Sequence, residues 1–178
     1  MSTKNINYPI GRFKLPSIID NNQINLWIST LENFPDRIEN LVATLTQEQI
    51  DTPYRTDGWT VRQLVHHLYD SHHNSYTRFK WALTEKSPLI KGFDERAWAD
   101  LFDSKNGPIE LSIHAIIALH AKWVYLLKGL NLADLQQSFV NPDENKTITL
   151  AENIGFYAWH CNHHFAKINN LLQEKGWN

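Results

Sequence analysis

The segment from Thr149 to Gly176 carries the signals of one long amphipathic helix. Thr149 and Glu152 have the spacing of a capping box, and Gly176 is a typical residue for the position after a helix. One face of this helix is a near-heptad series of mostly apolar residues: Leu150, Ile154, Tyr157, Cys161, His164, Ile168 and Leu171. Such a face is normally buried against other helices, so the segment favours a helical bundle.

Three other long segments have helical patterns. The first covers about Asn22 to Leu45, and Pro35 inside it predicts either a kink or two separate pieces. The second begins at Thr60, which forms a capping box with Gln63, and extends to about Glu85. The third runs from Pro108 to Gly129. Together with the helix after Thr149, these segments predict an all-α four-helix bundle.

Shorter features connect the helices. Residues 46–50 indicate an extra helical turn, and residues 94–100 indicate a short helix. Residues 139–140 and 147–149 are compatible with one small hairpin. The prolines and glycine within residues 1–19 predict an extended N-terminal arm.

Composition limits the class of protein. The 178 residues suggest a single domain, 1–178, with enough length for a sizeable core. The net charge of −2 and the absence of a basic stripe argue against nucleic acid. With one cysteine, Cys161, no intrachain disulfide is possible. Neither a signal peptide nor an apolar run of membrane-spanning length is evident, so we expect a cytoplasmic protein without membrane contact.

Histidines are the most informative polar residues. The chain has nine, and seven of them fall in two clusters, at residues 66–73 and 160–164. His160 and His164 are four residues apart, so on a helix both rings can reach one metal ion. Helical projection places His164 inside the apolar stripe, His160 at its edge and His163 well outside it. Burying an unpaired polar group costs about 1–3 kcal/mol, and a bound ion would offset that cost for both inward rings.

The other histidine cluster could supply a third ligand, but projection leaves two alternatives. His72 lies nearest the apolar stripe of its helix and His67 lies to one side. His66 and His73 point away from the stripe. With Asp70 they have the spacing of a second site, but we interpret them as a solvated polar face.

Two stretches resemble the metal motifs of the DinB/YfiT-like superfamily. Residues 58–80, which contain Trp59 and the first histidine cluster, are similar to its first motif, and residues 157–164 are similar to its last. The arm at residues 8–13 and the segment 94–98 resemble the YfiT-type branch. The likeness covers nearly the whole chain, and the combination of motifs is more specific than any one of them.

The resemblance implies a four-helix bundle in which three histidines bind one Zn²⁺ or Ni²⁺ per subunit. Carried over by motif, the metal ligands fall on His67, His160 and His164, which resolves the choice between His67 and His72. Many members have an acidic or small polar residue at the position of Cys161. The resemblance also implies a homodimer. Members of the branch are labelled metal-dependent hydrolases, and some relatives are thiol S-transferases that use bacillithiol.

Three neutral imidazoles leave a divalent ion with an open coordination position. Water there favours hydrolysis, and a thiol there favours transfer. The ligand set does not separate the two reactions, and the resemblance to the YfiT-type branch implies a metal-dependent hydrolase acting on a small molecule. The alternatives are a low-molecular-weight thiol S-transferase and a non-catalytic metal-binding bundle. No catalytic acid or base can be assigned, although four residues in or near the motifs are candidates: Asp70, Arg78, Tyr157 and Asn162.

Overall fold

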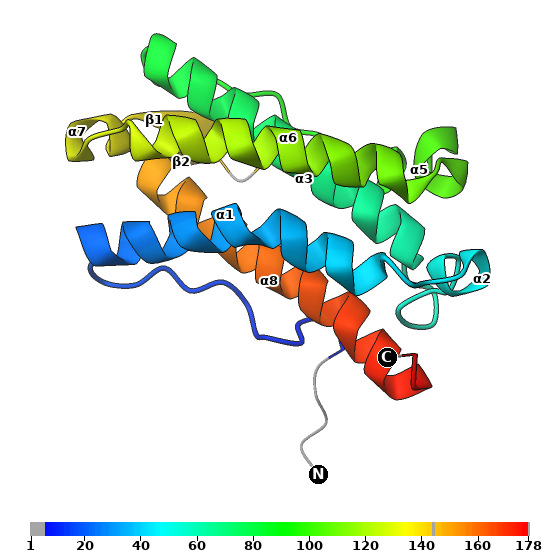
Figure 1. The fold of residues 1–178 in the computed structure, drawn as a ribbon. Helices are drawn as coiled ribbons and strands as arrows, with labels where there is room; N and C mark the ends of the chain where they lie inside the picture. Colours follow the sequence, from blue (N-terminus) through cyan, green and yellow to red (C-terminus); the bar gives the residue numbers. More distant parts are fainter. Residues whose placement is uncertain (1–5, 144, 178) are drawn as a thin grey trace.

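A computed structural model describes residues 6–143 and 145–177 (Figure 1). Its four long helices are α1 (Asn21–Val42), α3 (Val61–Thr84), α6 (Ile109–Lys128) and α8 (Leu150–Lys175). Helix α1 packs against α6 and α8, and α3 packs against the same two helices, so the four enclose a common core. The expected all-α four-helix bundle is confirmed.

Four short helices and one hairpin join the long helices. The short helices are α2 (Gln47–Ile50), α4 (Glu95–Ala99), α5 (Phe102–Asn106) and α7 (Leu132–Leu135). Strands β1 (Ser138–Asn141) and β2 (Lys146–Thr149) pair antiparallel, with Phe139 opposite Ile148. The small hairpin suggested by the sequence is therefore present, and it leads directly into α8.

The ends of α3 and α8 form as their sequences predict. The Thr60 hydroxyl oxygen accepts a hydrogen bond from the Gln63 N–H, and the Thr60 N–H donates one to the side-chain oxygen of Gln63. Thr149 and Glu152 make the same reciprocal pair at the start of α8. After α8, Gly176 adopts a left-handed conformation with φ 67°, which glycine adopts without a Cβ clash. These caps fix where the two histidine-bearing helices begin and end.

Pro35 lies inside α1 without dividing it. The helix is continuous from Asn21 to Val42, so of the two alternatives, a kink or two separate pieces, the second is not found. Proline has no backbone N–H and cannot donate to the carbonyl four residues earlier, which here belongs to Leu31. Leu31 and Pro35 are both buried, so this carbonyl needs a partner from another element.

The N-terminal arm is extended and docks on α8, as expected, in the part that the structure describes. The Trp159 indole N–H donates to the Gly11 carbonyl over 3.1 Å, and the rings of Phe13 and Phe156 meet edge to face. Figure 1 shows the arm passing beneath α1 toward the middle of α8. Residues 1–5 of the expected arm lie outside the described residues.

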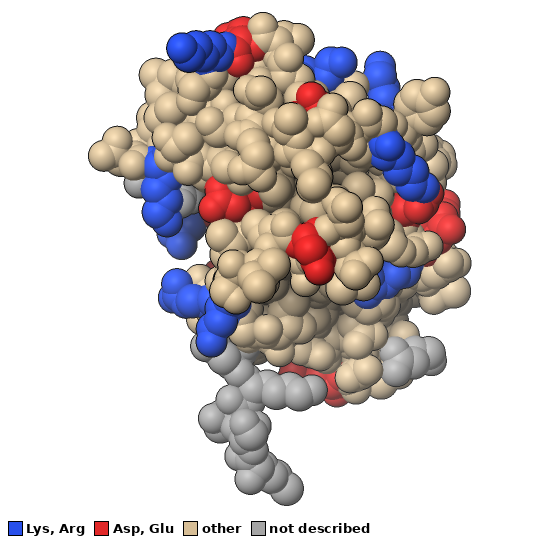
Figure 2. All heavy atoms as spheres, turned by 90° about the vertical axis from the view of Figure 1, so that its left-hand side faces the viewer, with Lys and Arg blue, Asp and Glu red and all other residues tan. Residues whose placement is uncertain are grey.

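Helix α6 is the one described helix that is long and apolar enough to cross a membrane by length and composition alone. From the sequence we expected no apolar run of that length. The helix packs between α1 and α3 and places Ile116 and Trp123 in the core, as a central bundle helix does. On the face shown in Figure 2, acidic and basic side chains are interspersed and form no continuous patch of either sign.

Candidate metal centre

Three histidines from two helices converge inside the bundle. His67 of α3 meets His160 and His164 of α8, and one ring nitrogen from each lies within 4.8 Å of the others. The Nε2 atoms of His67 and His160 are 3.3 Å apart. Two nitrogens bound to Zn²⁺ at about 2.0–2.1 Å in a tetrahedron are about 3.3 Å apart. The pair therefore already has the separation that a tetrahedral ion requires.

Burial keeps these rings uncharged. Removal from water lowers the pKa of His67 to about 3, with a further contribution from the positive charge of Lys167. The same causes, together with the neighbouring histidines, lower the pKa values of His160 and His164 well below the usual range. Neutral imidazole has the lone pair that a metal ligand needs, so all three rings are in the binding form at neutral pH.

The hydrogen bonding of His164 also fits an ion. Its Nδ1 atom is buried and has no hydrogen-bond partner within the described residues. A buried polar atom without a partner is unusual and calls for a ligand or an ordered water. The donor set of three neutral nitrogens suits Zn²⁺ or Ni²⁺. The residues present therefore fit a divalent cation.

Two further buried histidines, His72 and His120, are linked to His160 through ring-nitrogen contacts. His72 Nε2 is 3.0 Å from His160 Nδ1, and His72 Nδ1 is 2.7 Å from His120 Nε2. His120 Nδ1 is in turn 2.7 Å from the Leu31 carbonyl. From the sequence, His72 was expected only as a rival metal ligand, and no role was expected for His120. A usable signal was the place of His120 in the apolar stripe of α6, between Ile116 and Trp123.

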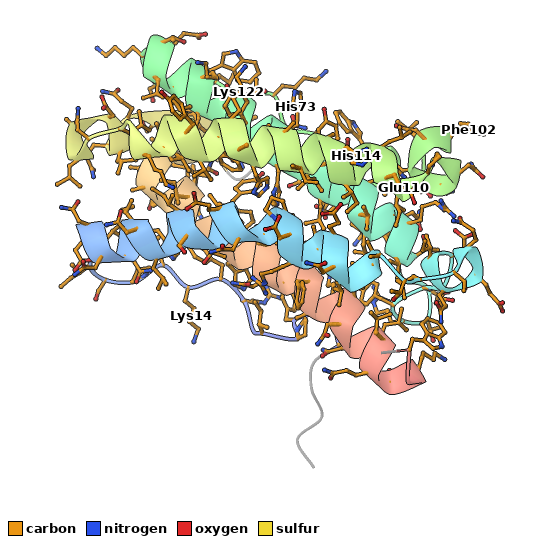
Figure 3. The ribbon with its side chains drawn as sticks, in the orientation of Figure 1. Lys14, His73, Phe102, Glu110, His114 and Lys122 are labelled. Atoms are coloured by element: carbon orange, nitrogen blue, oxygen red, sulfur yellow. The ribbon has the colours of Figure 1, made fainter. Side chains whose placement is uncertain are left out.

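The remaining histidines divide into buried and exposed ones. The expectation of a solvated face for His66 is wrong, because its ring is buried against the Ser112 hydroxyl and the Gly107 carbonyl, at 2.7 and 3.1 Å. His163 lies outside the convergent set, as projection indicated, but stacks on Trp159 and is buried. His73 and His114 are exposed, and Figure 3 shows both on the outside of the bundle.

Similar proteins identify the family of this chain. Residues 30–168 match the DinB superfamily. The chain belongs to the DinB superfamily. It is 48% identical to "Putative metal-dependent hydrolase OB0782" of Oceanobacillus iheyensis, over 97% of this chain and 99% of the relative. It is 44% identical to "Putative metal-dependent hydrolase YfiT" of Bacillus subtilis, over 99% of both chains.

A solved structure of Bacillus subtilis YfiT has the same fold. Its TM-score is 0.95 at 44% identity, covering 98% of this chain and 99% of the other. That protein is described as "a probable metal-dependent hydrolase with an unusual four-helix bundle topology". Membership of the DinB superfamily, inferred from the motifs, is thus confirmed. The ligand roles of His67, His160 and His164 stay a prediction, supported by their convergence.

The centre of this DinB protein opens into a cavity of about 1290 Å³. His160 and His164 form part of its wall, and the arm contributes Tyr8 and Phe13. The four acid/base candidates from the sequence do not line it: Asp70, Arg78, Tyr157 and Asn162. The ionisable residues that do line it include Lys167 and Arg55.

The acid/base candidates have structural partners or lie elsewhere. Tyr157 is buried, donates to the Ser71 carbonyl over 3.1 Å and has a pKa raised by burial. Asn162 accepts a hydrogen bond from Arg37 of α1 over 2.9 Å. Burial and the charge of Asp103 raise the pKa of Asp70 to about 6.

Cys161 is fully buried in the core of the DinB bundle. Burial raises the pKa of its thiol well above the usual range, so the side chain stays protonated at neutral pH. A protonated thiol is a poor nucleophile and a poor metal ligand. Cys161 therefore acts as a small apolar residue, and any thiol that takes part in chemistry must come from outside the chain.

Proposed function

We propose that this protein is a metal-dependent hydrolase of a small molecule, with one Zn²⁺ or Ni²⁺ per subunit held by His67, His160 and His164. The observation that carries the proposal is the convergence of three neutral, buried histidines, two of which, His160 and His164, line a solvent-open cavity. A structural zinc site usually has four protein ligands, whereas three ligands leave one position for a reactant. The names of the relatives support the same class of reaction.

A divalent ion in such a site supplies Lewis acidity and lowers the pKa of a coordinated water or thiol. The chain supplies the rest of the environment. Trp59 packs on His67 with the ring centres 4.8 Å apart, which shields one side of the centre from water. Trp159 and Phe156 give the cavity apolar walls that can position an organic substrate. Lys167 brings a positive charge that can stabilise negative charge in a transition state.

Transfer of a low-molecular-weight thiol is the second candidate function. The same open position accommodates a thiolate, and Cys161 cannot provide one because it is buried and protonated. A transferase of this kind would therefore depend completely on an added thiol. Hydrolysis would need only water.

This difference gives the experiment. Zinc-loaded protein is incubated with an activated ester and with an alkyl chloride, each with and without free cysteine as the thiol, and the products are identified by mass spectrometry. We expect hydrolysis of the ester without thiol, with a rate that rises with pH toward about 7. Products that form only with cysteine and carry its sulfur would favour transfer. No turnover of either substrate by metal-loaded protein would favour a non-catalytic bundle.

A further inference from the structure

His120, His72 and His160 form a series of hydrogen bonds that ends at the Leu31 carbonyl. This carbonyl determines which nitrogen of each ring is protonated. The Leu31 carbonyl can only accept, so His120 must donate to it from Nδ1. Burial lowers the pKa of His120 to about 4, so the ring is neutral and has one proton. Its Nε2 atom is therefore an acceptor.

The same reasoning applies to the rings of His72 and His160. His72 must donate from Nδ1 to His120 Nε2, and a ring with one proton then accepts at Nε2 from His160. His160 then carries its proton on Nδ1. The lone pair of His160 is left on Nε2, the atom that faces His67 at 3.3 Å.

The carbonyl that fixes this sequence of bonds is available because of Pro35. In an uninterrupted helix the N–H of residue 35 would donate to the Leu31 carbonyl. Proline removes that donor, and His120 takes its place from the neighbouring helix α6. A helix-interior proline is unfavourable by itself, so its presence beside this bond calls for a reason.

We propose that Pro35 and the Leu31 carbonyl, acting through His120 and His72, set the tautomer of His160 and direct its Nε2 lone pair to the metal. His72 and His120 are thus positioning residues, and neither binds the ion. Outer hydrogen-bond partners of metal-binding histidines typically change metal affinity about 10–100-fold when they are removed.

The first test is the tautomer itself. In metal-free wild-type protein, nitrogen NMR should show His160 protonated on Nδ1 and unprotonated on Nε2. A proton on Nε2 of His160 would overturn the proposal. The measurement needs neither metal nor activity, so it is independent of the proposed function.

The second test is zinc affinity, measured by competition with a chelator. His72→Phe should bind zinc at least tenfold more weakly than wild type. His66→Phe is the matched control, because His66 is a buried histidine of the same helix that bonds to Ser112 and Gly107 instead. Its affinity should stay within about threefold of wild type. Wild-type affinity in His72→Phe would overturn the proposal.

Pro35→Ala provides a variant that keeps all the histidines, in case His72→Phe fails to fold. The new N–H at residue 35 competes with His120 for the Leu31 carbonyl. We expect zinc affinity to fall severalfold while circular dichroism shows an intact helical bundle. Unchanged affinity in folded Pro35→Ala would contradict the role assigned to the proline.

A different observation bears on the substrate and rests on the proposed function. Lys167 lies one turn beyond His164 on α8, about 4.5 Å further along the helix axis. Its ammonium group lies over the Tyr54 ring at 4.9 Å, and burial lowers its pKa to about 8. In the described part of the chain, Lys167 has no carboxylate within ion-pair distance.

Arg55 provides a second half-buried cation on the same cavity wall. Its Nε donates to the Tyr54 hydroxyl and one terminal nitrogen donates to the Thr56 carbonyl, each over 2.9 Å, and the other terminal nitrogen makes no hydrogen bond within the described residues. The acidic residues at the cavity do not neutralise this pair. Asp100 pairs with Lys105, Asp57 makes no ion pair within the described residues, and Glu95 acts on Lys167 only from beyond ion-pair distance.

We propose that the substrate carries a carboxylate or phosphate group that binds Lys167 and Arg55 while its reacting bond lies against the three histidines. Two half-buried cations beside a site for a divalent ion concentrate positive charge in one cavity. An anionic group placed between them offsets that charge, and charge-assisted hydrogen bonds are the strong ones.

Binding to zinc-loaded full-length protein tests this site by calorimetry, with glutarate, inorganic phosphate and neutral glutaramide as probes. Wild type should bind an anion and not glutaramide, and the tighter of the two anions identifies the group. Lys167→Met should weaken anion binding about tenfold, and Lys167→Arg should retain most of it. Lys122→Met is the control, because Lys122 lies on the outer side of α6 (Figure 3).

Equal anion affinity in wild type and Lys167→Met would overturn the anion site, as would an absence of anion binding by wild type. Because the assay measures binding, its failure is distinct from failure of the hydrolase proposal. Ester hydrolysis without anion binding would remove only the anion site. Anion binding without turnover of any substrate would contradict only the hydrolase proposal.

Discussion

The Nε2 atoms of His67 on α3 and His160 on α8 lie 3.3 Å apart, in rings that burial keeps neutral. The two helices carry this pair in the middle of the bundle, where each ring is also surrounded by other aromatic rings. An ion between them would link α3 to α8. The metal should therefore contribute to the stability of the fold as well as to chemistry.

Removing the metal should lower the melting temperature. An ion that binds only the folded state, at a concentration 100 times its Kd, stabilises by about 2.7 kcal/mol. For a chain of this length that corresponds to a shift of about 5–10 °C. Scanning calorimetry with and without chelator should show the shift in wild type and none in a His67→Ala, His164→Ala double variant. Equal shifts in both proteins would place the ion elsewhere.

Acid should destabilise the metal-free protein through its buried histidines. The pKa of His67 is about 3 in the folded chain, against an ordinary value of 6.5, so the unfolded chain binds a proton first as pH falls. Stability is complete above pH 6.5 and is lost toward pH 3, by up to about 1.36 kcal/mol per pH unit for this group. Urea unfolding of metal-free His67→Gln should show a shallower loss, and identical slopes would contradict the assignment.

The sequence predicted the long helices well because their limits depend on local chemistry. The capping boxes at Thr60 and Thr149 and the terminal Gly176 act within one turn of chain. The effect of Pro35 was harder to predict, because it depends on a contact far away in the sequence. The Leu31 carbonyl, which loses its intrahelical donor at Pro35, accepts from His120, 89 positions away in the sequence, and the helix continues without the break that was one of the two alternatives.

The histidines, too, were predictable only where the local pattern of apolar residues is clear. Projection around α8 identified His160 and His164 because the apolar stripe of that helix is clear. On α3 the buried surface extends around most of the first half of the helix, so His66, His67 and His72 are all buried and projection could not rank them. Only their hydrogen-bond partners distinguish the three. His66 contacts Ser112, His67 contacts the α8 histidines and His72 contacts His120.

The contact between α1 and α8 depends on a glycine. A Cβ built on Gly155 would lie 2.8 Å from the Trp27 ring, closer than side chains normally approach. Gly155→Ala should therefore destabilise the bundle by about 1–3 kcal/mol, although alanine is the better helix former. Urea unfolding measures the change. A more stable Gly155→Ala protein would show that the ring moves aside freely.

We expect the protein to form a homodimer. Large apolar side chains are exposed on and beside α6, and they include Phe102, Leu111 and Tyr125, which are 82%, 65% and 84% exposed. Apolar side chains this exposed are candidates for burial against a second copy of the chain. Light scattering at micromolar concentration should give twice the chain mass of 20.8 kDa. A particle of 20.8 kDa would contradict the expectation.

The metal content of untagged protein tests the central claim most directly. Elemental analysis should find close to one Zn²⁺ or Ni²⁺ per chain in wild type. His67→Ala, His160→Ala and His164→Ala should each lose most of it, because three convergent ligands become two. His163→Ala should keep it, since His163 stacks on Trp159 outside the convergent set. Metal content like that of wild type in His160→Ala would contradict the account.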